Sequence, residues 1–169
     1  MNDKKIAFIG LGNMGGPMAA NLVKAGFEVA GFDLSKLAQM AASKAGISLA
    51  ESAAEAVKGA GTLMTMLPAG KHVIGVWAEV LPTLAKCALV IDSSTIDMTS
   101  ARRAHQLASE QGCLSLDAPV SGGVGGASAG TLTFMVGGAK EALFSNTWAR
   151  ASCIVATPAR VRRPRSAIT

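Results

Sequence analysis

The sequence predicts an α/β fold in which a mainly parallel, doubly wound sheet carries helices on both faces. Three observations lead to this prediction. Short apolar runs alternate with segments of helical length along residues 1–149. The runs are apolar throughout, as in strands that are buried on both faces. A Gly-rich turn directly follows the first run. Right-handed crossovers between such strands give an open sheet of the Rossmann type.

The order of the expected elements follows from these runs and from the residues that interrupt them. Gly26 stands where a helix C-terminus usually places glycine, and Pro68 ends the fourth apolar run. Residues 114–116 lead into a Gly-rich loop. Strands are expected at residues 5–9, 27–32, 46–49, 62–67, 88–91 and 131–136. Helices are expected at residues 14–25, 34–44, 52–58, 71–84 and 98–111.

Composition restricts the class of protein. Half of the 169 residues are hydrophobic and 16% are charged, which predicts a buried core. No run reaches the roughly 18 apolar residues of a membrane span, and the first strand begins too early for a signal peptide. Three cysteines at wide spacing, Cys87, Cys113 and Cys153, fit neither a disulfide framework nor a metal site. We therefore expect a cytoplasmic protein with no metal and no membrane partner.

The excess positive charge is confined to the C-terminus. The chain has 16 basic and 11 acidic side chains, a net charge of +5. Residues 150–169 include five arginines and no acidic residue, so residues 1–149 are neutral overall. Such a tail is either a solvated extension or an arm that binds nucleic acid.

The Gly-rich turn at residues 10–15 reads Gly-Leu-Gly-Asn-Met-Gly and matches the pattern G-x-G-x-x-G. Its place between a strand and a helix is the context in which this pattern binds a dinucleotide. Gly10 would permit the tight turn, and Gly12 would let the diphosphate approach the backbone. Gly15 would let the helix pack closely on the strand, and the helix N-terminus would attract the phosphates.

Asp33 completes the pattern at the end of the second strand, eighteen residues after Gly15. A carboxylate there can accept both ribose hydroxyls and would repel a 2′-phosphate, which favours NAD over NADP. The alternative is a turn that merely needs glycine, with Asp33 as a solvated strand end or a helix N-cap.

Two later loops also carry polar groups. Residues 117–126 (DAPVSGGVGG) can turn several N–H groups and the Ser121 hydroxyl toward one small carboxylate, or form a surface loop without a ligand. The hydroxyls of residues 92–96 (DSSTI) can bind a ribose or a substrate, or cap the helix that starts near Met98. His72 and His105 lie within expected helices, and we assign each an ordinary surface or core role.

Four segments, taken together, resemble the β-hydroxyacid dehydrogenases over residues 4–144. They are GLGNMGGPMAANL, TMLPAGKHV, IDSSTID and DAPVSGGVGGASAGTLTFMVGG, in that order. The resemblance is strongest to the branch that oxidises 3-hydroxyisobutyrate with NAD in valine breakdown. It implies a small hydroxycarboxylate substrate and a homo-oligomer.

The resemblance also implies roles for individual residues. The cofactor-contacting positions would be Gly10, Leu11, Gly12, Asn13, Met14, Gly15, Asp33, Leu67, Pro68 and Thr95. The substrate carboxylate would be held by Ser121, Gly122 and Gly123.

The resemblance ends after Phe144. Such enzymes continue through a Met-Gly turn to G-x-G-x-x-x-K-x-x-N-N, which supplies the catalytic lysine and opens an all-helical second domain. This chain reads TWARASCIVATPARVRRPRSAIT instead. We hypothesise a change of reading frame, because an ACA codon for Thr147 would let Trp148 and Ala149 read Met-Gly one base earlier.

Under this hypothesis, residues 1–146 would form the NAD-binding domain, and residues 147–169 a disordered, Arg-rich tail. The helical second domain and the catalytic lysine would both be missing, so the chain would contain no catalytic residue and would turn over little substrate. The alternatives are a reductase of tartronate semialdehyde, another β-hydroxyacid dehydrogenase, a non-catalytic NAD-binding module and, least favoured, a nucleic-acid binder.

Overall fold

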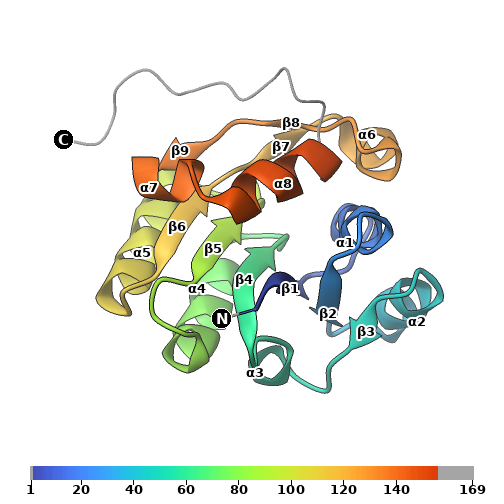
Figure 1. Cartoon of the computed structure of the whole chain (residues 1–169), viewed down its shortest axis with the longest axis horizontal. Coiled ribbons are helices and arrows are strands. Elements are labelled where there is room, and N and C mark those ends of the chain that lie inside the picture. The colour runs from blue at the N-terminus through green and yellow to red at the C-terminus, as the bar shows by residue number, and fades with distance from the viewer. Residues whose placement is uncertain (1, 156–169) are drawn as a thin grey trace.

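A seven-stranded sheet in the order β3-β2-β1-β4-β5-β6-β9 forms the centre of the molecule in a computed structural model, which describes residues 2–155 (Figure 1). The first six strands in this order pair in parallel, and only β9 is antiparallel to its neighbour. The strands are β1 (Asn2–Ile9), β2 (Glu28–Phe32), β3 (Ser48–Leu49), β4 (Ala60–Thr65), β5 (Leu89–Asp92), β6 (Leu114–Asp117) and β9 (Gly137–Gly138). The predicted doubly wound α/β class is therefore confirmed.

Helices cover both faces because successive residues of each strand point to opposite sides. Ile6 and Phe8 of β1 belong to one apolar cluster, and Ala7 and Ile9 belong to the other. The first cluster packs against α1 (Gly15–Lys24), α2 (Lys36–Lys44), α6 (Gly123–Ala129), α7 (Lys140–Leu143) and α8 (Asn146–Val155). The second packs against α3 (Ala53–Ala56), α4 (Gly70–Val80) and α5 (Met98–Glu110), and the 3₁₀ turn Leu81–Thr83 follows α4. None of the helices described in residues 2–155 is long and apolar enough to span a membrane.

The Gly-rich segment after β6 differs from the expectation of a loop followed by one strand. Residues Gly123–Ala129 form helix α6, which ends at Gly130 in the left-handed conformation (φ +67°). Of the strand expected at 131–136, only β8 (Thr133–Phe134) forms, and it pairs with β7 (Val120–Ser121) outside the main sheet. Because the left-handed residue reverses the chain, β8 returns beside β7 and does not add to the parallel sheet.

The expected disorder from residue 147 is wrong for residues 147–155, which lie in α8. Trp148, Ala151 and Val155 are buried in the first cluster, and the Trp148 ring packs edge-on against Phe134 with 5.3 Å between ring centroids. These three residues recur at helical spacing. The expectation of disorder rested on the arginine content of the segment and did not consider this pattern. Residues 156–169, with the rest of the expected tail, lie outside the described residues.

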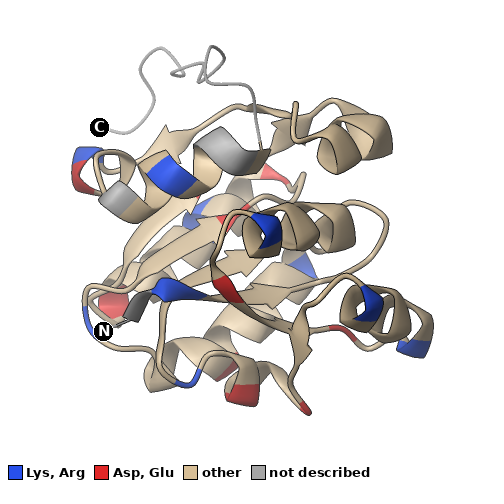
Figure 2. Ribbon diagram, turned by 45° about the vertical axis from the view of Figure 1, so that its right-hand side comes forward, with Lys and Arg blue, Asp and Glu red and all other residues tan. Residues whose placement is uncertain are grey.

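Basic and acidic residues are interspersed along the described part of the ribbon (Figure 2). Arg150, the first arginine of the basic segment, lies over the Phe27 ring at 4.9 Å from its centroid. This arginine therefore contributes to packing within the domain.

Candidate dinucleotide-binding site

The turn between β1 and α1 uses its three glycines in two ways. Gly10 has a φ of +95°, and a Cβ there would collide with the carbonyl oxygen of Met66. A Cβ on Gly15 would collide with the carbonyl oxygen of Gly10. A Cβ on Gly12, in contrast, would meet nothing within 4 Å. Gly10 and Gly15 are thus required by packing, whereas Gly12 keeps open space beside the backbone.

The N-terminus of α1 is free of side-chain caps. Its N-cap residue, Met14, makes no capping hydrogen bond, and the first turn holds no acidic residue. Gly16 N donates to Gly12 O at 3.0 Å, four residues back as in a helix. The N–H groups of residues 12–14 lie before this bond, at the exposed start of the helix. A helix terminus of this kind carries a partial positive charge and unused donors, which suit a phosphate.

Asp33 is fixed at the end of β2 by two backbone donors. Leu11 N donates to Asp33 Oδ2 at 2.7 Å, and Ser35 N donates to Asp33 Oδ1 at 2.7 Å. The cap of α2 is Ser35, whose hydroxyl accepts from Ala38 N, so Asp33 is not the N-cap of that helix. The carboxylate is held beside the Gly-rich turn and keeps lone pairs for further donors.

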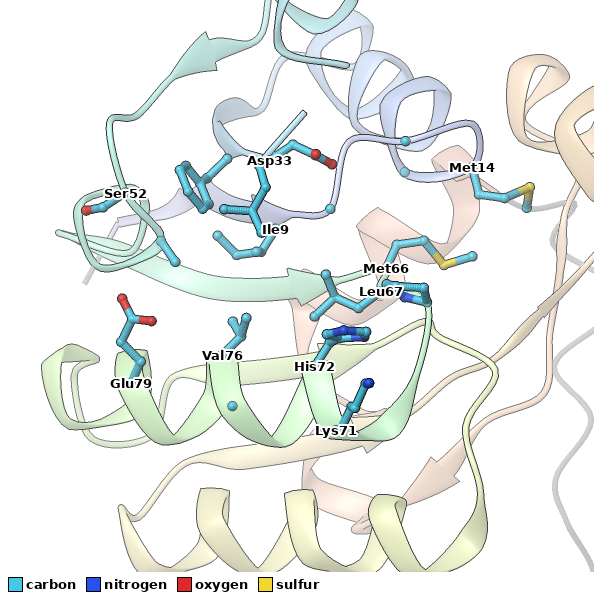
Figure 3. Close-up of a pocket in the computed structure, with 18 of the residues that line it drawn as sticks. Ile9, Met14, Asp33, Ser52, Met66, Leu67, Lys71, His72, Val76 and Glu79 are labelled. Carbon is cyan, nitrogen blue, oxygen red and sulfur yellow. The ribbon is translucent and has the colours of Figure 1, made fainter. Parts of the chain in front are cut away.

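A cavity of about 990 Å³ joins these features (Figure 3). Eight predicted cofactor residues line it: Gly10, Gly12, Asn13, Met14, Gly15, Asp33, Leu67 and Pro68. Leu11 is buried behind the wall and contributes its N–H to Asp33. The other lining residues are Ile9, Phe32, Leu34, Ser52, Ala53, Met66, Lys71, His72, Gly75, Val76 and Glu79.

Sequence reasoning missed the wall that α4 provides. His72, Val76 and Glu79 share one face of this helix and lie along the cavity in Figure 3. Their spacing of four and three residues could have indicated that face. Whether this face points into the cavity depends on how α4 packs on the sheet, and the residue types alone do not reveal that.

Thr95, Ser121, Gly122 and Gly123 do not line this cavity. Thr95 is exposed three residues after β5, and Ser121 is exposed within β7. Both segments leave the same edge of the sheet as the Gly-rich turn, because the carboxyl ends of parallel strands meet there. The helix cap considered for this region comes from Asp97, whose side chain accepts from Ser100 N at 2.9 Å.

A group of ionisable residues lies where β5 and β6 end. Asp92 and Asp117 are paired residues of these two strands. Burial raises the pKa of Asp92, and burial together with the Asp92 charge raises the pKa of Asp117 to about 6. Burial lowers the pKa of His105, whose Nδ1 lies 2.6 Å from Ser115 Oγ. All three groups are buried or partly buried, and none of them lines the cavity.

The residues present fit a dinucleotide. A single cavity joins three features: the open space at Gly12, the uncapped N-terminus of α1 and the fixed carboxylate of Asp33 one strand away. A diphosphate would lie at the first two features and a ribose at the third. Within residues 2–155, no group of three or more His, Cys, Asp or Glu side chains could hold a metal ion.

A comparison with protein families decides the membership of the chain. Residues 5–151 match the NAD binding domain of 6-phosphogluconate dehydrogenase. The chain belongs to this family. It therefore has a domain for a nicotinamide cofactor, as the Gly-rich turn predicted.

Similar proteins of known name extend this result. The chain is 54% identical over 143 residues to the NAD-dependent L-serine dehydrogenase of Pseudomonas aeruginosa, covering 83% of this chain and 48% of that protein. It is 53% identical over 138 residues to a probable 3-hydroxyisobutyrate dehydrogenase of Mycobacterium tuberculosis, covering 82% of this chain and 47% of that protein. The chain thus spans about half the length of these curated relatives.

A solved structure resembles the whole described fold. The Mycobacterium tuberculosis 3-hydroxyisobutyrate dehydrogenase with L-serine superimposes with a TM-score of 0.83 at 48% identity. The match covers 94% of this chain and 52% of that one. The domain of residues 2–155 therefore corresponds to about half of a larger chain.

Proposed function

We propose that this chain is the cofactor-binding part of an NAD-linked β-hydroxyacid dehydrogenase. The observation that carries the proposal is the open space at Gly12 beside the uncapped N-terminus of α1. The names of the relatives, two kinds of dehydrogenase for small hydroxy acids, support it. When bound, the nicotinamide ring accepts a hydride from the carbon that carries the substrate hydroxyl.

NAD is the proposed cofactor because of Asp33. Its two oxygens are already oriented by Leu11 N and Ser35 N, which fixes a negative charge where the adenosine ribose would lie. The remaining lone pairs would accept the 2′- and 3′-hydroxyls, whereas a 2′-phosphate would be repelled. NADH should therefore bind at least tenfold more tightly than NADPH, a difference of about 1.4 kcal/mol.

The loop after β6 is the proposed site for the substrate carboxylate. Gly122 and Gly123 have φ values of +135° and +62°, and Ser121 is exposed beside them. Conformations of this kind turn consecutive N–H groups outward, where they can bind an oxygen anion. Thr95 is a further proposed cofactor contact from the neighbouring loop.

The proposed substrate is 3-hydroxyisobutyrate, oxidised to methylmalonate semialdehyde. L-serine is a second candidate, since one relative is named for it and one solved relative contains it. Both molecules carry a carboxylate and a hydroxyl on the third carbon, so the same anion site would hold either. Tartronate semialdehyde, the product of the corresponding oxidation of glycerate, is the third alternative.

Oxidation also requires a group that accepts the hydroxyl proton. No residue of this sequence matches the lysine that the family resemblance implies for this role. Lys71 in α4 and Lys140 at the start of α7 do not stand in that motif, so we assign the role to neither. We propose that the chain by itself binds the cofactor and turns over little substrate.

Binding and turnover test the proposal separately. Calorimetry of the full chain should detect NADH binding, weakened about tenfold or more by Asp33→Ala. The same change should not weaken NADPH binding, because it removes the charge that repels the 2′-phosphate. Oxidation of 3-hydroxyisobutyrate and of L-serine should be negligible in this chain and measurable after the reading frame is restored between codons 140 and 170. Lack of NADH binding by folded protein would refute the function, whereas turnover by the unaltered chain would refute only its inactivity.

A further inference from the structure

Asp92 lies beneath the two loops that follow β4 and β5. The side chain is 3% exposed, and one oxygen, Oδ1, accepts three hydrogen bonds. Thr65 Oγ1 donates from the end of β4 at 2.8 Å. Ser94 donates twice from the loop after β5, through Oγ at 2.6 Å and through its backbone N at 3.2 Å. A single carboxylate oxygen therefore joins the ends of two neighbouring strands.

Each hydroxyl that donates to Asp92 also accepts a bond from a residue further out. Trp77 Nε1 of α4 donates to Thr65 Oγ1 at 3.3 Å. Leu67 N donates to Ser94 Oγ at 2.8 Å. Two chains of donors thus run inward, one from α4 and one from the loop after β4, and both end at Asp92 Oδ1. Such chains polarise one another and strengthen the acceptor's hold.

The outer end of one chain is a wall of the cofactor cavity. Leu67 lines the cavity together with Met66 and Pro68, and its N–H is the group that Ser94 holds. In the sheet order, β2 with Asp33 and β1 with the Gly-rich turn stand on one side of β4. A dinucleotide with its adenosine ribose at Asp33 and its diphosphate at the turn would extend its other half toward β4 and β5.

We propose that Asp92 is a positioning residue, which holds the loops after β4 and β5 as the wall for the nicotinamide half of the cofactor. The assignment rests on the proposed function, since it takes the cavity to be the dinucleotide site. An apolar side chain of similar size would fill the same volume but leave the two Ser94 donors without this acceptor, and the Thr65 hydroxyl with only the 3.4 Å contact to Ile91 O. The loops would then have no common anchor.

A matched pair of threonines on β4 allows a sharp test. Thr65→Val removes a hydroxyl that bonds to Asp92. Thr62→Val removes a hydroxyl that is buried on the same strand and has no hydrogen-bond partner among the described residues. Ser94→Ala removes the other link without adding volume. Asp92→Asn keeps one acceptor oxygen, so it should lose less affinity for NADH than Asp92→Ala among folded variants.

The discriminating readout compares two ligands by calorimetry with the full chain. NADH contains the nicotinamide half, whereas AMP contains only the adenylate half. Thr65→Val and Ser94→Ala should each raise the Kd for NADH about five- to tenfold and leave that for AMP unchanged, because each removes a hydroxyl that donates to Asp92 and accepts from a residue further out. Thr62→Val should change neither. An equal loss for both ligands, or no loss for either, would overturn the assignment.

Hydrogen exchange separates this assignment from the proposed function. The Leu67 amide should exchange faster in Thr65→Val and Ser94→Ala than in the unaltered chain or in Thr62→Val, with the change confined to residues 65–68 and 92–95. If the unaltered chain bound neither ligand, the proposed function would fail while this measurement still reported on the loops. Unchanged exchange at Leu67 would overturn the role of Asp92.

Discussion

The connections after β1 and after β5 leave the same edge of the sheet and lead into helices, yet they use their polar groups differently. The helix after β1 starts without a side-chain cap, and Gly12 faces open space. The helix after β5 starts with a cap from Asp97, and the preceding hydroxyl of Ser94 is bonded within the protein. The first connection leaves donors for a ligand, whereas the second uses the Ser94 hydroxyl and the Asp97 carboxylate in bonds within the protein.

Polar groups at this edge of the sheet therefore fall into two classes. The N–H groups of residues 12–14 in the Gly-rich turn are available to a ligand, whereas Asp92 and its partners determine the shape of the wall that a ligand would meet. Substitutions in the two connections should therefore separate stability from binding.

The largest effect is expected for Gly10→Ala. Its φ of +95° and the collision of a new Cβ with the Met66 carbonyl oxygen require the β1 and β4 ends to move apart. We expect a loss of about 2–4 kcal/mol in the free energy of unfolding, measured by denaturant titration. A loss below about 0.5 kcal/mol would mean that the turn tolerates a side chain.

Gly12→Ala should affect binding and spare stability. The new Cβ meets no protein atom within 4 Å, so the free energy of unfolding should change by less than about 1 kcal/mol. The same methyl group would occupy space for the diphosphate and raise the Kd for NADH about tenfold or more, measured by calorimetry. Normal affinity in this variant would exclude close approach of the diphosphate to Gly12.

Asp97→Ala, in the connection after β5, should lower stability and leave NADH binding unchanged, the reverse of the result expected for Gly12→Ala. Removing the cap of α5 should lower the melting temperature by about 2–4 °C. The Kd for NADH should stay within twofold, because Asp97 does not line the cavity. Asp97→Asn, which can still accept from Ser100 N, is the control and should recover most of the melting temperature.

Asp117→Asn should show the smallest effect, and one that depends on pH. The native pKa of about 6 lies above the usual value near 3.8, so the folded state binds the proton more tightly. The stability that this group contributes is present below about pH 4 and is lost as the pH rises through 6. The variant should gain up to about 1 kcal/mol over the unaltered chain at pH 8 and nothing at pH 4, because solvent near Asp117 limits the effect. A constant difference in the free energy of unfolding across this range would contradict a raised pKa at Asp117.

Local signals were sufficient for much of the fold and of the site. The apolar runs predicted the parallel strands, and the Gly-rich turn with Asp33 predicted the residues around which the cavity is built. Both are local in sequence, since a strand, a turn and a helix follow one another without a long connection.

The parts that escaped prediction depend on packing between distant segments. Ser52 and Glu79 reach the cavity because α3 and α4 return across the sheet. From the sequence, the Ser94 hydroxyl can serve a ribose, a substrate or a helix cap, whereas in the structure it bonds to Asp92 and Leu67. The sequence predicts a disordered tail that includes Trp148, whereas this side chain packs in the core on one face of the sheet. These contacts depend on how the helices and strands pack against one another, which the local sequence does not reveal.

Dinucleotide binding at the Gly-rich turn can be tested by titrating the isotopically labelled chain with NADH and following the backbone amide signals by NMR. We expect the amides of Gly12, Asn13 and Met14 to shift most, with a further shift at Leu11, whose N–H is bonded to Asp33. Saturating NADH that leaves these four signals in place on a folded chain would contradict binding at this turn.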